Sequence, residues 1–181
     1  MYRRFAGRPR MDILPVRSEC ASATNLPLLV EKPLLAARYA HTNLTAEDWE
    51  TLASFYERVF GCVRLLPQRD YQDEALETSR LRLRGVHLRL PGHGDNGPTL
   101  EIFGYDPLSH RARTAPNRPG FGHIAFEVPD VAAARAVVLA EGGTALGDIA
   151  TQVTPLGRRV TWAYVMDPEC NVIELQAWAD Q

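Results

Sequence analysis

One feature limits the folds open to this 181-residue chain more than any other: it contains the same series of predicted elements twice. The stretch YAHTNLTAEDWETLASFYERVFG reads as a short strand followed by an amphipathic helix that ends at Gly61. PGFGHIAFEVPDVAAARAVVLAEGG repeats this order up to Gly142 and Gly143. Self-similarity of this kind indicates one supersecondary unit used twice.

Each predicted helix also has start signals and is followed by strands. Thr45 is expected to cap the first helix with Asp48 in the reciprocal position, and Asp130 to cap the second. Strand patterns follow in LRLRGVHLRLP and PTLEIFGY, and again in RRVTWAYVMDP and NVIELQAW. The sequence therefore predicts an α+β fold of two βαβββ modules, at about residues 36–110 and 119–179.

A glycine-rich segment between two of these strands has the spacing GxGxxG of dinucleotide-binding loops, at Gly92, Gly94 and Gly97. In such loops a helix opens at the third glycine. Here Pro98 and the alternating segment TLEIF follow instead, which favours a hairpin turn.

Composition excludes several classes of function. The net charge of −2 gives no basic excess for binding nucleic acid, and no apolar run approaches the roughly 20 residues of a membrane span. Cys20, Cys62 and Cys170 stand apart, so neither a disulfide framework nor a thiolate zinc site is expected. We expect a cytoplasmic protein whose residues 1–35, rich in Arg and Pro at the start, form a flexible or arm-like extension.

Four polar residues stand at matching places in the two repeats. His41 and His123 lie in the first strands, and Glu101 and Glu174 lie in the last ones. Alternation in a strand directs these side chains to one face, while the aliphatic neighbours face the helices. The rows expected on the polar face are Tyr39, His41 and Asn43; Glu101, Phe103 and Tyr105; Phe121, His123 and Ala125; and Glu174, Gln176 and Trp178.

Two imidazoles and two carboxylates on one face favour a divalent metal ion. Burying them separately is costly, and two unpaired carboxylates repel each other. The donor atoms suit Zn, Ni, Co, Fe or Mn, and four protein ligands leave two positions of a six-coordinate ion open for a substrate. The alternative is that each glutamate pairs with an arginine such as Arg82, Arg84 or Arg89.

The motifs YAHTNL, SFYERVFG, PTLEIFGY, GFGHIAFEVPD and VMDPECNVIELQ resemble those of the vicinal oxygen chelate superfamily over residues 36–179. This superfamily includes glyoxalase I, methylmalonyl-CoA epimerase, extradiol dioxygenases, and fosfomycin and bleomycin resistance proteins. The resemblance implies a curved, incomplete mixed β-barrel with the helices outside. It also implies a metal site made by His41, Glu101, His123 and Glu174.

The ligand set helps to select an activity within the superfamily. A glutamate at position 101 is similar to glyoxalase I, and the presence of all four residues disfavours a member that only binds its ligand. The sequence differs from bacterial glyoxalase I at two places, and both differences disfavour glutathione as cosubstrate. Thr45 stands where bacterial glyoxalase I carries an Arg, and DPECN replaces the usual DPDG.

The expected activity is therefore that of a metal-dependent lyase or isomerase of the glyoxalase or epimerase type. Glu174 is the first choice for the catalytic base, with Glu101 as its counterpart. The alternatives are an Fe(II)-dependent extradiol-type dioxygenase that uses His41, His123 and Glu174, and a metal-dependent binding or resistance protein.

The expected substrate is a small molecule with two neighbouring oxygens, and the expected assembly is a homodimer. In this superfamily similar modules pair within one chain or between two chains, so both arrangements of the site stay open. His87, His93 and His110 are expected to have no special role. Residues predicted to contact the substrate are Asn43, Phe103, Tyr105, Phe121, Gln176, Trp178, Arg111 and Arg113.

Overall fold

The computed structural model describes residues 35–73, 81–109 and 119–179. The chain divides into a unit of residues Met1–Ala37 and a compact unit of residues Arg38–Gln181, and the account below concerns the second. The predicted N-terminal extension thus lies almost wholly outside the described residues. The same is true of Arg111, Arg113 and His110.

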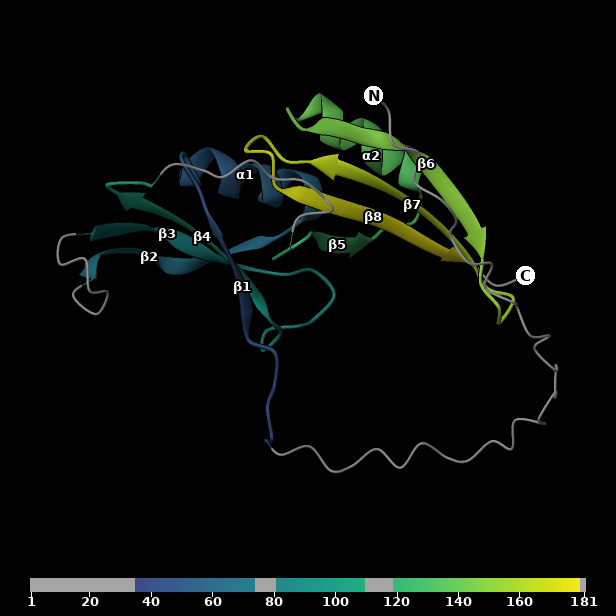
Figure 1. Cartoon of the computed structure of the whole chain (residues 1–181). Coiled ribbons are helices and arrows are strands. Elements are labelled where there is room, and N and C mark those ends of the chain that lie inside the picture. The colour runs from purple at the N-terminus through teal and green to yellow at the C-terminus, as the bar shows by residue number, and fades with distance from the viewer. Residues whose placement is uncertain (1–34, 74–80, 110–118, 180–181) are drawn as a thin grey trace, which may run out of the picture. The chain divides into compact units, whose positions relative to one another are not determined.

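The described residues form two helices and two four-stranded sheets (Figure 1). The strand orders are β1-β4-β3-β2 and β5-β8-β7-β6, with one parallel pair, β1/β4 or β5/β8, in each sheet. This confirms the α+β fold with two βαβββ modules; the two sheets remain separate and form no closed barrel. The elements are β1 (His41–Thr45), α1 (Trp49–Phe60), β2 (Val63–Asp73), β3 (Leu81–Arg89), β4 (Thr99–Asp106), β5 (Ile124–Glu127), α2 (Val131–Ala140), β6 (Thr144–Val153), β7 (Arg159–Met166) and β8 (Val172–Ala179).

The predicted start of the first helix was wrong by one turn. Asp48, not Thr45, is the N-cap of α1, because its side chain accepts hydrogen bonds from the backbone N–H and the hydroxyl of Thr51. Thr45 is still part of β1, where it pairs with Phe103 of β4. The start and end predicted by Asp130 and Gly61 are confirmed: Asp130 caps α2, and Gly61 ends α1 with a φ of 68°.

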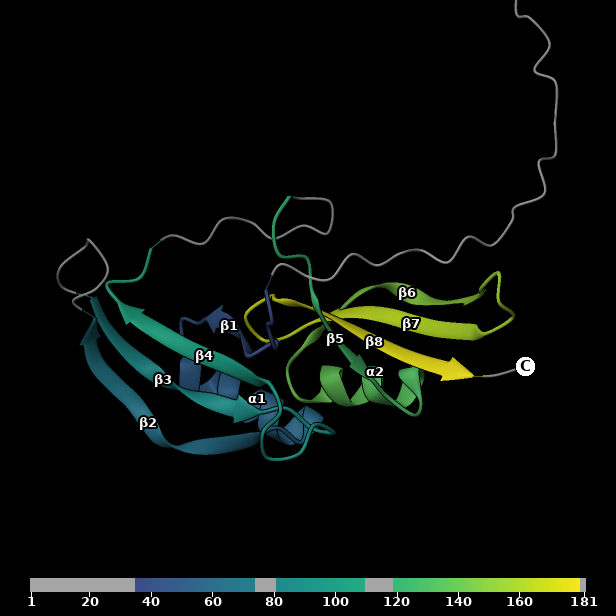
Figure 2. The same ribbon diagram turned by 90° about the horizontal axis from the view of Figure 1, so that it is seen from below.

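Each helix covers one face of the sheet in its own module (Figure 2). Val86, Leu88, Leu100 and Ile102 of the first sheet are fully buried on the face toward α1, and Val165, Ile173 and Leu175 are buried in the second. Glu101 lies between Leu100 and Ile102, and Glu174 lies between Ile173 and Leu175. Successive side chains of a strand point to opposite faces, so both glutamates point away from the buried face. The face of each sheet away from its helix is therefore where Glu101 and Glu174 lie. The glycine-rich segment at residues 91–98 joins β3 to β4 as a turn, as predicted.

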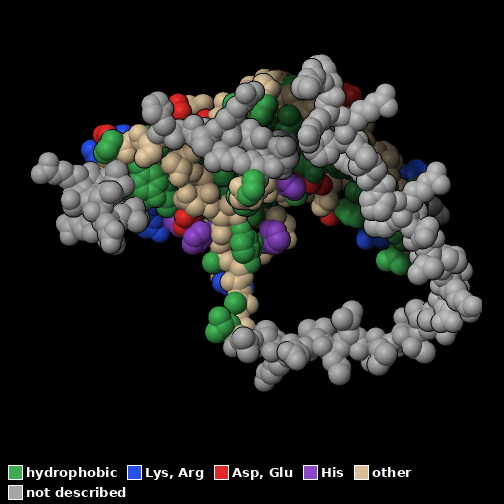
Figure 3. Space-filling view, in the orientation of Figure 1, with side chains coloured by type: hydrophobic (Ala, Val, Ile, Leu, Met, Phe, Trp, Pro, Cys, Tyr) green, Lys and Arg blue, Asp and Glu red, His purple; other side chains and the backbone are tan. Residues whose placement is uncertain are grey.

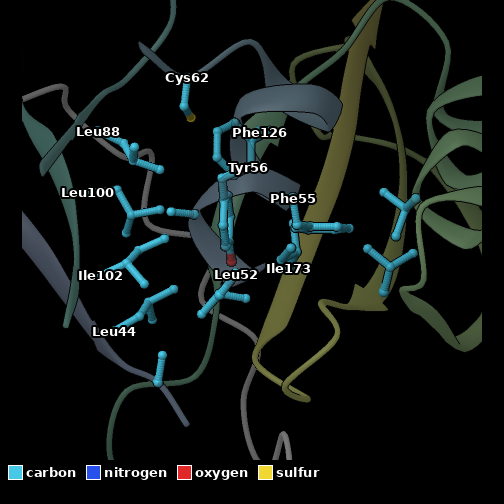
Figure 4. Packing of buried hydrophobic residues seen from close by; sticks show 14 of the residues in the cluster. Leu44, Leu52, Phe55, Tyr56, Cys62, Leu88, Leu100, Ile102, Phe126 and Ile173 are labelled. Carbon is cyan, nitrogen blue, oxygen red and sulfur yellow. The ribbon is translucent and has the colours of Figure 1, made fainter. Parts of the chain in front are cut away.

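A single apolar core joins the two modules through α1. Phe60 stacks on Phe126 of β5 with ring centroids 4.0 Å apart, and Phe55 and Tyr56 of α1 are fully buried. Figure 4 shows Tyr56 between Leu100 of the first sheet and Ile173 of the second, with Phe55 on the side of Ile173. The modules are therefore parts of one hydrophobic unit.

The turn between β7 and β8 also binds α1. The hydroxyl of Tyr56 donates to the buried carboxylate of Asp167 at 3.0 Å, and Asn171 donates to it as well. Burial raises the pKa of Asp167 although these donors oppose the rise. Glu169 accepts hydrogen bonds from the backbone N–H groups of Glu47 and Asp48, at 2.9 and 2.8 Å. Glu169 thus satisfies free N–H groups just before α1.

Candidate functional site

The first candidate half-site lies on the open face of the first sheet, around Glu101 of β4. Glu101 is paired with Asn43 of β1 on one side and with His87 of β3 on the other. Directly paired residues on adjacent strands project from the same face, so the three side chains meet. Glu101 is only 9% exposed, which makes it one of the two buried charged residues among those described.

The carboxylate of Glu101 contacts three polar side chains. Its Oε1 atom lies 3.6 Å from His41 Nδ1 and 3.4 Å from His87 Nε2, and its Oε2 accepts a hydrogen bond from Asn43 Nδ2 at 3.3 Å. Two of the arginines that could have paired with Glu101 bind elsewhere, since Arg82 pairs with Asp70 and Arg89 with Asp95. Histidines, not these two arginines, thus contact this carboxylate.

His87 is held as a neutral ring. Burial lowers its pKa, and Arg69 and His41 lower the pKa further, while Glu101 acts in the opposite direction. Its Nδ1 atom lies 3.5 Å from the Thr99 hydroxyl, and its ring packs edge-on against Phe103 with centroids 5.6 Å apart. A neutral imidazole has one N–H, and Glu101 can only accept a hydrogen bond when ionised, so the proton belongs on Nε2.

The second candidate half-site lies around Glu174 of β8. His123 immediately precedes β5, and its Nε2 atom lies 2.9 Å from Glu174 Oε2. Glu174 is paired with Tyr164 of β7 and with Ala125 of β5. The Tyr164 hydroxyl donates to Glu174, and burial together with the charge of Glu174 raises the pKa of this phenol. The phenol therefore stays protonated at neutral pH.

The two half-sites occupy equivalent positions in the two modules. Glu101 corresponds to Glu174, and the residue across the antiparallel pair is His87 in the first module and Tyr164 in the second. Neither His87 nor Tyr164 was predicted to belong to the site. The available signal was strand alternation: in GVHLR, His87 lies between the buried Val86 and Leu88 and must face the other way.

Imidazole nitrogens and carboxylate oxygens, gathered on little-exposed glutamates, are donors that suit a divalent transition metal. Within residues 35–73, 81–109 and 119–179, no group of three or more His, Cys, Asp or Glu side chains is arranged to hold a metal ion. The predicted ligands are therefore brought together as two pairs and not as a set of four. Figure 3 shows histidine side chains at the surface of the molecule on both sides of β1.

The predicted substrate contacts are distributed over both open faces. Asn43 binds Glu101, and Phe103 is buried beside His87. Phe121 is 66% exposed and lines a small hollow of about 120 Å³ together with Leu44 and Asn171. Tyr105, Gln176 and Trp178 continue the rows of Glu101 and Glu174; the guanidinium of Arg158 lies 4.8 Å from the centre of the Trp178 ring. Arg111 and Arg113 lie outside the described residues.

Cys62 is a buried free cysteine. Burial raises the pKa of the Cys62 thiol to about 12, so this thiol is not a nucleophile at neutral pH. Neither described helix has the length and apolar character that crossing a membrane requires.

Comparison with known proteins agrees with the fold. Residues 40–175 match the family model of the Glyoxalase/Bleomycin resistance protein/Dioxygenase superfamily. A glyoxalase family protein from Bacillus cereus is similar in structure, with a TM-score of 0.60 and 17% sequence identity over 83% of this chain and 98% of that one. A glyoxylase/bleomycin resistance protein/dioxygenase domain from Frankia sp. EAN1pec has a TM-score of 0.51 and 17% identity over 80% of this chain and 100% of that one. No match was found among curated proteins. Because the family match spans most of the sequence and includes both half-sites, the chain belongs to the glyoxalase/bleomycin resistance protein/dioxygenase superfamily.

Proposed function

We propose that the protein is a divalent-metal-dependent lyase or isomerase of the glyoxalase or epimerase type. The observation that carries this proposal is the matched pair of half-sites: a His–Glu contact of 3.6 Å in the first module and of 2.9 Å in the second, at equivalent positions. The glutamate side chains of these pairs are only 11% and 17% exposed, and a carboxylate withdrawn from water is costly unless it is paired or binds a cation.

His41, Glu101, His123 and Glu174 would hold the ion. A bound divalent ion supplies Lewis-acid stabilisation of negative charge on substrate oxygens. The fitting substrate has two neighbouring oxygens, as in a 2-hydroxycarbonyl compound, a thiohemiacetal or a 2-substituted acyl thioester. Phe103, Tyr105, Phe121 and Trp178 would provide apolar surface beside it, and Gln176 a polar contact.

Glu174 is the proposed base. The Glu174 side chain is 17% exposed, against 11% for Glu101. Its partner on the parallel strand is Ala125, which is smaller than Asn43, the corresponding partner of Glu101. Glu174 would accept a proton from the carbon next to the carbonyl and return it to the neighbouring carbon or to the opposite face. The reaction is then an isomerisation or epimerisation without net oxidation.

In the proposed site, two copies of the chain supply the four ligands. Each chain presents two separate half-sites, and the described residues of one chain do not gather three ligands. We therefore infer that the first module of one copy faces the second module of another, in a homodimer with two sites.

A dioxygenase is the second candidate, with His41, His123 and Glu174 as the iron ligands. It would leave Glu101 outside the ligand set. The contact of Glu101 with His41 resembles the contact of Glu174 with His123, which supports four ligands over three.

Metal analysis and two variants separate these functions. The purified dimer should bind one divalent ion per chain, and Glu101→Gln should lower metal affinity and activity together, by about tenfold or more. Glu50→Gln, the same change on the exposed side of α1, should leave both unchanged. Solvent deuterium should enter a hydroxyketone or acyl thioester without oxygen uptake. Oxygen consumption on catechols by an iron-loaded Glu101→Gln variant would instead establish the dioxygenase.

A further inference from the structure

The carboxylate of Glu101 lies within a continuous chain of polar contacts that crosses three strands. The Thr99 hydroxyl lies 3.5 Å from His87 Nδ1, and His87 Nε2 lies 3.4 Å from Glu101 Oε1. On the other side, Asn43 Nδ2 donates to Glu101 Oε2 at 3.3 Å, and the Thr45 hydroxyl donates to Asn43 Oδ1 at 3.5 Å. The Oε1 atom is therefore contacted by His87 of β3 and His41 of β1, and the Oε2 atom by Asn43 of β1.

We propose that Asn43 and His87 are positioning residues that fix the orientation of Glu101 for metal binding. We call Asn43, His87 and Thr99 the Glu101 clamp. The proposal rests on the proposed function, because it assigns these side chains to the support of one of its four ligands. Asn43 is thereby assigned to the protein's own carboxylate, and not to the substrate as the sequence had indicated.

The geometry supports this assignment over two simpler ones. His87 is not an isolated core histidine, since one ring nitrogen faces Thr99 and the other faces Glu101. It is not assigned as a ligand either, because the equivalent place in the second module holds Tyr164, whereas the proposed ligands are the His–Glu pairs present in both modules. A carboxylate with both oxygens occupied loses most of its rotational freedom, and hydrogen bonds to a ligating carboxylate support metal affinity.

The clamp belongs to the first module alone. At the equivalent places of the second module stand Ala125, which has no donor, and Tyr164, whose hydroxyl donates to Glu174. Glu174 thus lacks the amide donor that Asn43 gives to Glu101.

Two measurements test the clamp. The first is a Co²⁺ titration of the full chain, read from the visible absorption of the bound ion. His87→Phe keeps the ring that packs on Phe103 but removes the donor, and Asn43→Leu removes the amide. Each should weaken Co²⁺ binding by about 10- to 100-fold. His87→Gln, which can still donate, should recover most of the affinity.

Arg84→Gln is the matched control, because Arg84 lies on β3 but faces the other side of the sheet, in register with Gly104. This variant should bind Co²⁺ as the wild type does. His87→Phe with wild-type affinity and spectrum would overturn the proposal, and so would an affinity loss that His87→Gln fails to restore.

The second measurement needs no metal. Urea unfolding of the metal-free wild type, His87→Phe, Glu101→Gln and the double variant gives the coupling between the two side chains. We expect the coupling to change the unfolding equilibrium constant by about tenfold. A wild-type chain that binds no Co²⁺ would refute the proposed metal function. In that case the coupling measured by urea unfolding tests whether His87 and Glu101 interact. A coupling of zero between the two side chains would overturn the clamp.

Discussion

The two modules share a strand order and a His–Glu pair, yet they surround their glutamates differently. Glu101 is contacted by His41, His87 and Asn43, whereas Glu174 is contacted by His123 and Tyr164. The repeated fold therefore places the two glutamates equivalently but surrounds them with different side chains. Under the proposed function, this difference corresponds to a division of roles, with Glu101 as a fixed ligand and Glu174 as the base.

The largest effect is expected when the two half-sites are disabled in different chains. Glu101→Gln should lose about tenfold or more of the activity through its metal affinity, and Glu174→Gln, which removes the proposed base, about 100-fold or more. If the site forms between two chains, a refolded mixture of the two variants should regain about a quarter of the wild-type activity, because half of the dimers then contain one intact site of two. The measurement is the initial rate before and after mixing.

The double variant Glu101→Gln/Glu174→Gln, mixed with either single variant, is the control and should regain nothing. A mixture of the single variants that stays inactive, although mass spectrometry shows mixed dimers, would place the whole site within one chain.

The modules also differ in packing next to these glutamates. Gly85 of β3 is paired with Phe103, while the equivalent pair in the second module is Trp162 with Gln176. In the first module the aromatic residue of the pair is on β4 and glycine is on β3, whereas in the second module the aromatic residue is on β7. A Cβ added at Gly85 would lie 2.2 Å from the backbone oxygen of Ile102 and 2.4 Å from the Phe103 ring.

Gly85→Ala should therefore destabilise the protein by about 3 kcal/mol, since backbone cannot move away as a flexible side chain can. Urea unfolding measures the loss. Gly122→Ala, where a Cβ would meet nothing within 4 Å, should change stability by less than about 0.5 kcal/mol. Equal stability of the two variants would show that the first sheet accommodates the methyl group.

The two helices also differ: among the described residues, only α1 carries a buried hydroxyl, that of Tyr56, which donates to a buried carboxylate, that of Asp167. Tyr56→Phe would leave Asp167 without one of its donors and should cost about 1–3 kcal/mol in urea unfolding. Tyr39→Phe, at a residue that is 61% exposed, should cost less than about 0.5 kcal/mol.

The same variant has a predicted pH dependence. Burial and the charge of Asp167 raise the pKa of Tyr56, so the native state keeps this proton after the unfolded chain has lost it near its ordinary value of about 10. The contribution of Tyr56 is complete below about pH 10 and is lost as the pH rises further. The stability difference between wild type and Tyr56→Phe should shrink above pH 10; a constant difference would contradict the assignment.

Much of the fold could be predicted from the sequence, because periodicity and capping are local signals. The two modules, the caps at Asp130 and Gly61 and the hairpin at Gly92 follow from them. The start of α1 at Asp48 could not, since Thr45 and Asp48 are both good caps. Pairing of Thr45 with Phe103 of β4 decides between them, and this is a contact distant in sequence.

The candidate site was predicted in part for the same reason. Repetition identified the two His–Glu pairs, and alternation identified their faces. His87 and Tyr164 belong to strands without a repeated residue type, so comparison of the repeats gave no signal for them. How the two modules pack against each other, with Phe60 stacked on Phe126, is a contact distant in sequence that no local pattern encodes.

The hydrogen bonds from Glu47 and Asp48 to Glu169 connect the turn between β7 and β8 to the segment that precedes α1 in the other module. Turns usually accept insertions, because little else depends on their length. Here an insertion between Asp167 and Asn171 would withdraw the carboxylate from the residues just before α1, which directly follow the strand that carries His41. Loop grafting, often the safest way to change an enzyme's specificity, would at this turn alter a half-site in the other module.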